Sequence, residues 1–140
     1  MAETTAPKVV MVVDDSQTIR NIMALILHRL GYRSVRVRSA MEALNTLTEL
    51  VPDLIFLDIT LPGMDGLDVC KVIKDNHRTK HVPVVILSGS DQVFDRVLGR
   101  LAGATDYVTK PFAPETIRQC VEMHCGRNPQ VREGLWTKQR

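Results

Sequence analysis

Five short apolar segments alternate with segments of helical periodicity, and this alternation restricts the possible folds more than any other feature of the chain. The apolar segments are residues 8–13, 33–37, 53–57, 83–87 and 105–109. Their composition is typical of strands in a parallel sheet with helices on both faces. Because a helical segment rather than a hairpin separates consecutive strands, the connections must be right-handed crossovers. The sequence therefore predicts an α/β domain with a doubly wound, five-stranded parallel sheet.

The segments between the strands carry signals for the starts and ends of helices. Ser16 is a candidate N-cap for the first helix, and Gly31 ends it. Pro52 follows the second helix, and Pro114 suits the first turn of the last one. The other helices are expected after the turn-rich residues 61–66 and over residues 93–101. We thus expect five strands and five helices in strict alternation.

Composition limits the class of protein. A chain of 140 residues that is 44% hydrophobic and 24% charged is typical of one globular domain. The formal net charge is only +2, so we expect no direct contact with nucleic acid. The apolar segments are far shorter than the roughly 18 residues of a membrane span, so we expect a cytoplasmic protein without membrane insertion.

The cysteines and histidines give no motif. Cys70, Cys120 and Cys125 form neither a C-x-x-C pair nor an even disulfide set, which fits a reducing compartment and inert thiols. The four histidines are scattered without the spacing of metal ligands, and no role is predicted for them: they are His28, His77, His81 and His124.

Polar side chains stand where the predicted strands end. They are Asp14 and Asp15 after the first strand, Asp58 after the third, Ser88 after the fourth and Lys110 after the fifth. In doubly wound sheets, ligands bind beyond the carboxyl ends of the strands. No glycine-rich phosphate loop follows the first strand, so we expect no nucleotide site.

The charge of this set predicts its chemistry. Three carboxylates repel one another, and a single lysine does not neutralise them, so a hard divalent cation is expected. All-oxygen ligation suits Mg²⁺, which commonly accompanies a phosphoryl group. Asp58 is the candidate nucleophile, because it follows four apolar residues at the predicted centre of the sheet. Taken singly, Asp14 or Asp15 could instead be a helix cap, and Lys110 a surface charge.

Residues 8–125 resemble the receiver domain of bacterial two-component response regulators. The resemblance rests on Asp14-Asp15, Asp58 after Leu-Ile-Phe-Leu, Pro62-Gly-Met-Asp-Gly66, Ser88 after Val-Val-Ile-Leu, and Lys110-Pro111-Phe112. It implies a flavodoxin-like (βα)5 fold with strand order 2-1-3-4-5. Residues 1–7 and 126–140 are then short terminal tails.

The resemblance implies a role for each acidic residue. Asp58 is expected to be the phosphoacceptor. Mg²⁺ is expected to bind Asp15 directly, Asp14 through water, the carboxylate of Asp58 and the backbone carbonyl of Thr60.

The resemblance also implies how the phosphoryl group is bound and sensed. Lys110 and Ser88 are expected to contact its oxygens, and the Lys110–Pro111 peptide bond is expected to be cis. Ser88 and Tyr107 would form a switch pair that couples the site to a distant surface.

At the level of function, the resemblance implies a signalling switch that catalyses only its own phosphorylation and dephosphorylation. A sensor histidine kinase would donate the phosphoryl group, and a downstream protein would read the surface of the fourth helix, fifth strand and fifth helix. Residues 94–112 look like those of stand-alone receivers in chemotaxis-type systems that control type IV pilus motility. Residues 126–140 are too few for an output domain, which also favours a stand-alone receiver.

Two other functions remain open on the sequence. An Mg²⁺-dependent aspartyl-phosphate phosphatase or phosphotransferase would use the same nucleophile, but Thr60 stands where such enzymes place a general acid. A receiver-shaped scaffold would bind partners without phosphorylation, although the complete acidic set argues against it.

Overall fold

The computed structural model describes residues 7–89 and 93–126, and within them five strands alternate with five helices. The strands are β1 (Val9–Val13), β2 (Arg33–Val37), β3 (Leu54–Asp58), β4 (Val84–Ser88) and β5 (Asp106–Thr109). The helices are α1 (Gln17–Arg29), α2 (Ala40–Leu47), α3 (Gly66–Asp75), α4 (Val93–Leu101) and α5 (Pro114–Cys125). The predicted alternation is confirmed, while the predicted tails fall mostly on residues 1–6 and 127–140, outside the described residues.

The strands form one parallel sheet in the order β2-β1-β3-β4-β5, as predicted. Val10 pairs with Leu54, Leu57 with Ile86, and Ser88 with Thr109. The chain first builds outward from β1 to β2, then returns across β1 to β3 and continues to β5. The order therefore reverses between β1 and β3, and ligands of doubly wound sheets bind beside such a reversal.

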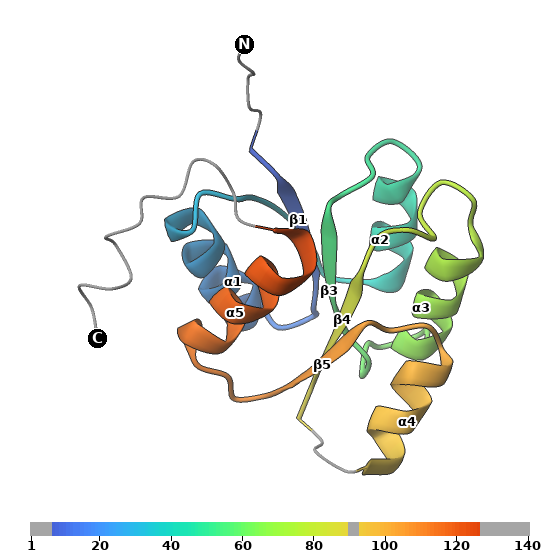
Figure 1. Cartoon of the computed structure of the whole chain (residues 1–140). Coiled ribbons are helices and arrows are strands. Elements are labelled where there is room, and N and C mark those ends of the chain that lie inside the picture. Colours follow the sequence, from blue (N-terminus) through green and yellow to red (C-terminus); the bar gives the residue numbers. More distant parts are fainter. Residues whose placement is uncertain (1–6, 90–92, 127–140) are drawn as a thin grey trace.

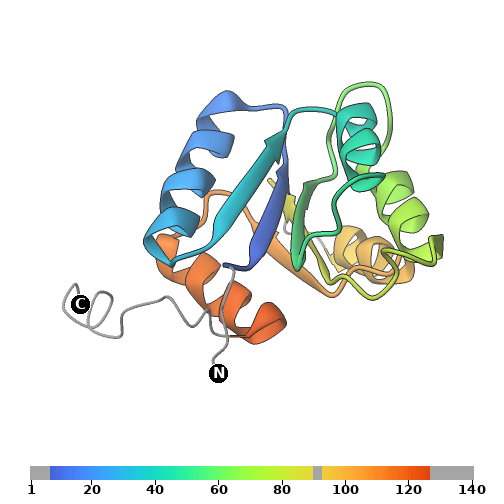
Figure 2. The same cartoon turned by 90° about the horizontal axis from the view of Figure 1, so that it is seen from above.

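Two apolar cores cover the faces of the sheet. Helices α1 and α5 lie on one face, and α2, α3 and α4 lie on the other (Figures 1 and 2). Alternate residues of the strands contribute to each core because successive side chains point to opposite faces. The α1/α5 core includes Val10, Val12, Phe56, Leu87, Leu27 and Ile117, and the α2/α3 core includes Met11, Val13, Ile55, Leu57, Ala43 and Ile73.

Local sequence signals set the helix ends. The Ser16 hydroxyl accepts a hydrogen bond from the backbone N–H of Ile19 at 3.3 Å, which confirms its predicted capping role. Asp65 caps α3 in the same way, with its Oδ1 2.8 Å from the N of Leu67. Gly31 has a φ of 84° directly after the C-cap of α1, a conformation that glycine adopts at little cost.

Two strand ends differ from the prediction. Asp58 and Ser88 were expected to follow β3 and β4, but each is the last residue of its strand. Their pairing with Leu87 and Thr109 continues the backbone ladder by one residue. The sheet therefore holds both residues in place. In the part of the chain that the structure describes, no helix combines the length and apolarity needed to cross a bilayer.

Candidate functional site

The carboxyl ends of β1 and β3 bring three aspartates together. Asp14 and Asp15 follow β1, and Asp58 ends β3, the neighbouring strand. One carboxylate oxygen from each lies within 4.8 Å of the other two. Asp14 and Asp58 are buried, with 0% and 2% of their surface exposed, whereas Asp15 is exposed. This cluster, called the acidic pocket below, thus has two buried carboxylates and one that faces solvent.

Lys110 reaches this acidic pocket from the end of β5. Its Nζ lies 2.7 Å from Asp14 Oδ2 and 3.4 Å from Asp58 Oδ2. The second oxygen of Asp14 accepts a hydrogen bond from the backbone N–H of Ser16 at 2.9 Å. One ammonium group between two buried carboxylates leaves the pocket with an excess of negative charge, which favours binding of a cation.

Thr60 makes two hydrogen bonds to the central aspartate. Its backbone N–H and its hydroxyl lie 2.9 Å and 2.8 Å from Asp58 Oδ1. These bonds hold one oxygen of Asp58, while the other faces Lys110. The hydroxyl contact was not foreseen, although an Asp followed two residues later by Thr is a recognisable Asx-type turn signal. The role expected for the Thr60 carbonyl stays a prediction.

Ser88 and Tyr107 lie on the same face of neighbouring strands. Ser88 pairs with Thr109, and Tyr107 is two residues earlier on β5, paired with Ile86. Paired residues of parallel strands and residues two apart point to the same face. Ser88 is 2% exposed and Tyr107 half-buried. The Lys110–Pro111 peptide bond is cis.

Arg96 of α4 covers Tyr107, a contact that no pattern in the sequence predicts. Its guanidinium carbon lies 4.8 Å from the centroid of the tyrosine ring, a cation–π distance. Its Nη2 also lies 3.3 Å from the Thr109 hydroxyl. Arg96 therefore joins α4 to both residues of β5 that share a face with Ser88.

Gly66 allows the start of α3 to lie close to the backbone of Asp58 and Ile59. A Cβ at this position would lie 2.4 Å from Ile59 Cα and 2.5 Å from the Asp58 carbonyl oxygen. The backbone N–H of Gly66 instead donates to the Ile59 carbonyl at 3.3 Å. The start of α3 thus packs against the chain that leaves β3, and only glycine fits there.

The donor set fits Mg²⁺. All three side chains offer carboxylate oxygens, and the exposed side of the pocket leaves room for waters, which Mg²⁺ usually retains. Thiolates or imidazoles, which favour softer metals, do not belong to this group of ligands.

Comparisons with known proteins agree with this arrangement. The family model described as "Response regulator receiver domain" matches residues 10–122. Protein PilG of Pseudomonas aeruginosa is 37% identical over 115 residues, which are 82% of this chain and 85% of PilG. The DNA-binding response regulator MtrA of Mycobacterium tuberculosis is 36% identical over 119 residues, and this chain spans only about half of its length, 51%.

Solved structures show the same fold. The chemotaxis response regulator CheY4 of Vibrio cholerae superposes with a TM-score of 0.81 at 28% identity, covering 84% of this chain and 98% of CheY4. The receiver domain of the sensor histidine kinase PA1611 from P. aeruginosa gives a TM-score of 0.80 at 26% identity, covering 86% and 99%. That structure holds a magnesium ion coordinated in its active-site cleft.

Proposed function

Because this chain belongs to the receiver-domain family of response regulators, we propose that it is a signalling switch phosphorylated on Asp58 by a sensor histidine kinase. The observation that carries the proposal is the position of Asp58. It ends the central strand β3, and its carboxylate lies 3.4 Å from Lys110 and within 4.8 Å of Asp14 and Asp15. Such a site presents a nucleophilic carboxylate beside groups that can neutralise a phosphoryl group.

In this reaction the phosphoryl group would pass from the histidine of the kinase to the carboxylate of Asp58. A carboxylate oxygen of Asp58 forms a bond to phosphorus, the phosphorus–nitrogen bond of the donor phosphohistidine breaks, and the imidazole leaves with that electron pair. The two hydrogen bonds from Thr60 to Oδ1 fix the carboxylate, so it needs little reorientation before attack.

The acidic residues would hold the cation that this transfer needs. Asp15, Asp58 and the Thr60 carbonyl would bind Mg²⁺ directly, and Asp14 would bind it through water. When bound, Mg²⁺ supplies positive charge that stabilises the transferring phosphoryl oxygens. Asp14 also holds the Lys110 ammonium at 2.7 Å, which keeps this second positive charge beside Asp58.

The switch would run from Ser88 along one face of the sheet to α4. The hydroxyl of Ser88 would donate to a phosphoryl oxygen, which favours the backbone arrangement that permits this bond. Tyr107 and Thr109 share this face and both contact Arg96 of α4. A shift of Ser88 is therefore transmitted to side chains that hold α4 against β5.

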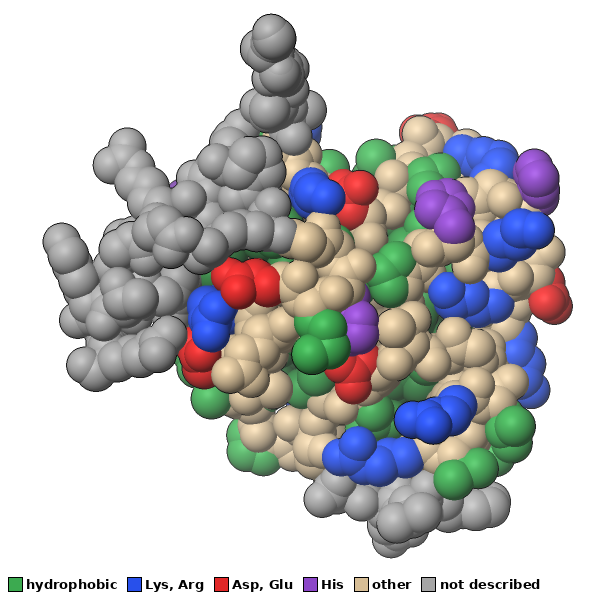
Figure 3. All heavy atoms as spheres, viewed as in Figure 1, with side chains coloured by type: hydrophobic (Ala, Val, Ile, Leu, Met, Phe, Trp, Pro, Cys, Tyr) green, Lys and Arg blue, Asp and Glu red, His purple; other side chains and the backbone are tan. Residues whose placement is uncertain are grey.

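A downstream protein would read the surface formed by α4, β5 and α5. Val97 and Leu101 on α4 are 49% and 76% exposed, and Met123 on α5 is 74% exposed. Basic side chains gather beside the two exposed residues of α4, over α4 and β5 (Figure 3). Exposed apolar side chains with a basic rim fit a protein partner with complementary acidic groups. We also propose a chemotaxis-type pathway, which the similarity to CheY4 supports.

Mg²⁺ is expected to be essential for phosphorylation. With acetyl phosphate and Mg²⁺, intact-mass spectrometry should show one phosphoryl adduct per chain, and excess chelator should abolish it, because the acidic pocket then repels the donor. Adduct formation that is unaffected by chelator would contradict the proposed metal role. Sustained turnover of a generic phosphate ester would instead support the phosphatase function.

Replacing Ser88 should separate phosphorylation from its structural effect. In Ser88→Ala we expect the adduct to form, but the change in hydrogen exchange of β5 and α4 on phosphorylation to fall by at least about half, because the donor to the phosphoryl oxygen is lost. The matched control is Ser34→Ala on β2, the edge strand opposite β5. This variant should show the same exchange response as the wild type. An undiminished exchange response in Ser88→Ala would show that the signal takes another route.

A further inference from the structure

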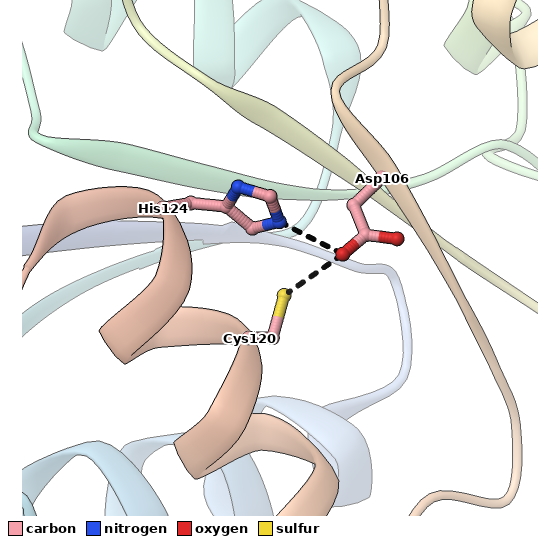
Figure 4. A group of neighbouring side chains, drawn as sticks. All are labelled: Asp106, Cys120 and His124. Atoms are coloured by element: carbon pink, nitrogen blue, oxygen red, sulfur yellow. Dashed lines mark hydrogen bonds and ion pairs between the residues drawn. The ribbon is translucent and has the colours of Figure 1, made fainter.

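A second cluster of polar side chains lies at the other end of β5 from Lys110. Asp106 is the first residue of β5, whereas Lys110 follows its last. Cys120 and His124 are four residues apart on α5, so their side chains share one face of the helix. This face is turned toward Asp106 (Figure 4). One potential ligand atom from each residue lies within 4.8 Å of the other two.

The contacts of this cluster converge on a single oxygen atom. His124 Nε2 lies 2.8 Å and Cys120 Sγ 4.0 Å from Asp106 Oδ2 (Figure 4). The other oxygen, Oδ1, accepts a hydrogen bond from the backbone N–H of Tyr107 at 2.7 Å. This bond fixes the carboxylate so that Oδ2 faces α5. The three potential ligand atoms therefore already lie next to one another.

We propose that Asp106, Cys120 and His124 form a Zn²⁺ site that joins β5 to α5, with the fourth coordination position open to water. A thiolate, an imidazole and a carboxylate make a ligand set that zinc prefers over magnesium or calcium. The thiolate and carboxylate together balance the charge of the cation, and the thiol proton is released to solvent on binding. This site is separate from the acidic pocket and does not rest on the proposed signalling function.

The existing geometry needs only small adjustments to hold the metal. Zinc–ligand bonds of about 2.0–2.3 Å in a tetrahedron place neighbouring ligand atoms about 3.4–3.6 Å apart. The present separations of 2.8 Å for His124 to Asp106 and 4.0 Å for Cys120 to Asp106 differ from this by about half an ångström. Side-chain rotations can supply such shifts without moving the strand or the helix.

The three side chains of the proposed zinc site differ in their exposure to solvent. Cys120 is 5% exposed, while the side chains of His124 and Asp106 are 13% and 40% exposed. The metal would thus enter past Asp106, on the side where water completes its coordination. Burial, followed by the negative charge of Asp106, raises the pKa of the Cys120 thiol to about 12. A bound cation reverses this effect, because it stabilises the thiolate.

The test is a titration of the 140-residue chain with Zn²⁺ in the presence of excess Mg²⁺, which should occupy the acidic pocket. Calorimetry should show one tight zinc equivalent per chain. Co²⁺ in place of Zn²⁺ should give visible bands of tetrahedral intensity and a thiolate-to-cobalt charge-transfer band. Cys120→Ser and His124→Gln should each weaken zinc binding more than about tenfold, since even outer-shell losses cost 10–100-fold.

Cys125→Ser is the matched control, because it removes a neighbouring thiol on the same helix. It should leave the zinc affinity and the cobalt charge-transfer band unchanged. The far-ultraviolet circular dichroism of each variant verifies folding, and His124→Gln provides an independent test where Cys120→Ser is unstable. The proposal is overturned when the wild type binds no zinc in excess Mg²⁺. It also fails when both site variants bind like the wild type, or when the charge-transfer band is lost in Cys125→Ser and kept in Cys120→Ser.

Discussion

Asp58→Asn should abolish phosphorylation of this protein by acetyl phosphate. The asparagine side chain has nearly the same shape, and its oxygen can still accept the hydrogen bonds from Thr60 at 2.8–2.9 Å. A neutral amide oxygen, however, is a poor nucleophile and cannot yield the acyl phosphate. Intact-mass spectrometry in Mg²⁺ should therefore change from one adduct per chain to none.

Two controls accompany the Asp58→Asn variant: its stability, and the phosphorylation of a variant at a distant aspartate. Without Mg²⁺, Asp58→Asn should be at least as stable as the wild type, because it removes one of three mutually repelling carboxylates. The matched substitution Asp75→Asn, at the exposed end of α3, should be phosphorylated normally. An adduct that persists in Asp58→Asn, and that peptide mapping assigns to Asp14 or Asp15, would show that the phosphoacceptor is misassigned.

Gly66→Ala should destabilise the domain by about 3 kcal/mol, the upper range for overpacking of a filled site. The new methyl group would lie 2.4 Å from Ile59 Cα and 2.5 Å from the Asp58 carbonyl oxygen. Both are backbone atoms, so no side-chain rotation relieves the overlap, and α3 must move away from the end of β3. Urea unfolding should show a lower midpoint. We also expect slower phosphorylation, because the displaced backbone carries Asp58 and Thr60.

Gly89→Ala is the matched control for this steric effect. Gly89 follows β4 and is exposed, and a Cβ there has no atom within 4 Å. Its stability should stay within about 0.5 kcal/mol of the wild type, as for most surface substitutions. Equal unfolding midpoints for Gly66→Ala and the wild type would show that the start of α3 shifts at little cost.

The strand-end residues show why the sequence was informative about the acidic pocket. Parallel strands align their carboxyl ends at one edge of the sheet, so an alternating pattern is enough to gather Asp14, Asp15, Asp58 and Lys110 there. The spacing of these residues along the chain does not predict which of their side chains contact one another. Lys110 is 96 residues from Asp14, and the 2.7 Å contact between them follows from the strand order and from the rotamer of a long side chain.

The cluster of Asp106, Cys120 and His124 shows the opposite case. From the sequence alone, the cysteines are expected to be inert thiols and no role is predicted for the histidines. The spacing of four residues between Cys120 and His124 was a usable signal, since such residues share a helix face. Their third neighbour could not be read from the chain, because Asp106 lies 14 residues before Cys120 on a different element.

The doubly wound parallel sheet, the strand-end residues and the start of most helices could be predicted from the sequence alone. These features depend on local periodicity and on rules of chain connection. The contacts between individual side chains are visible only in the folded chain: Lys110 with Asp14, Thr60 with Asp58, Arg96 with Tyr107, and His124 of α5 with Asp106. These contacts depend on side-chain conformation and helix packing across the sheet. Neither property is encoded in a spacing along the chain.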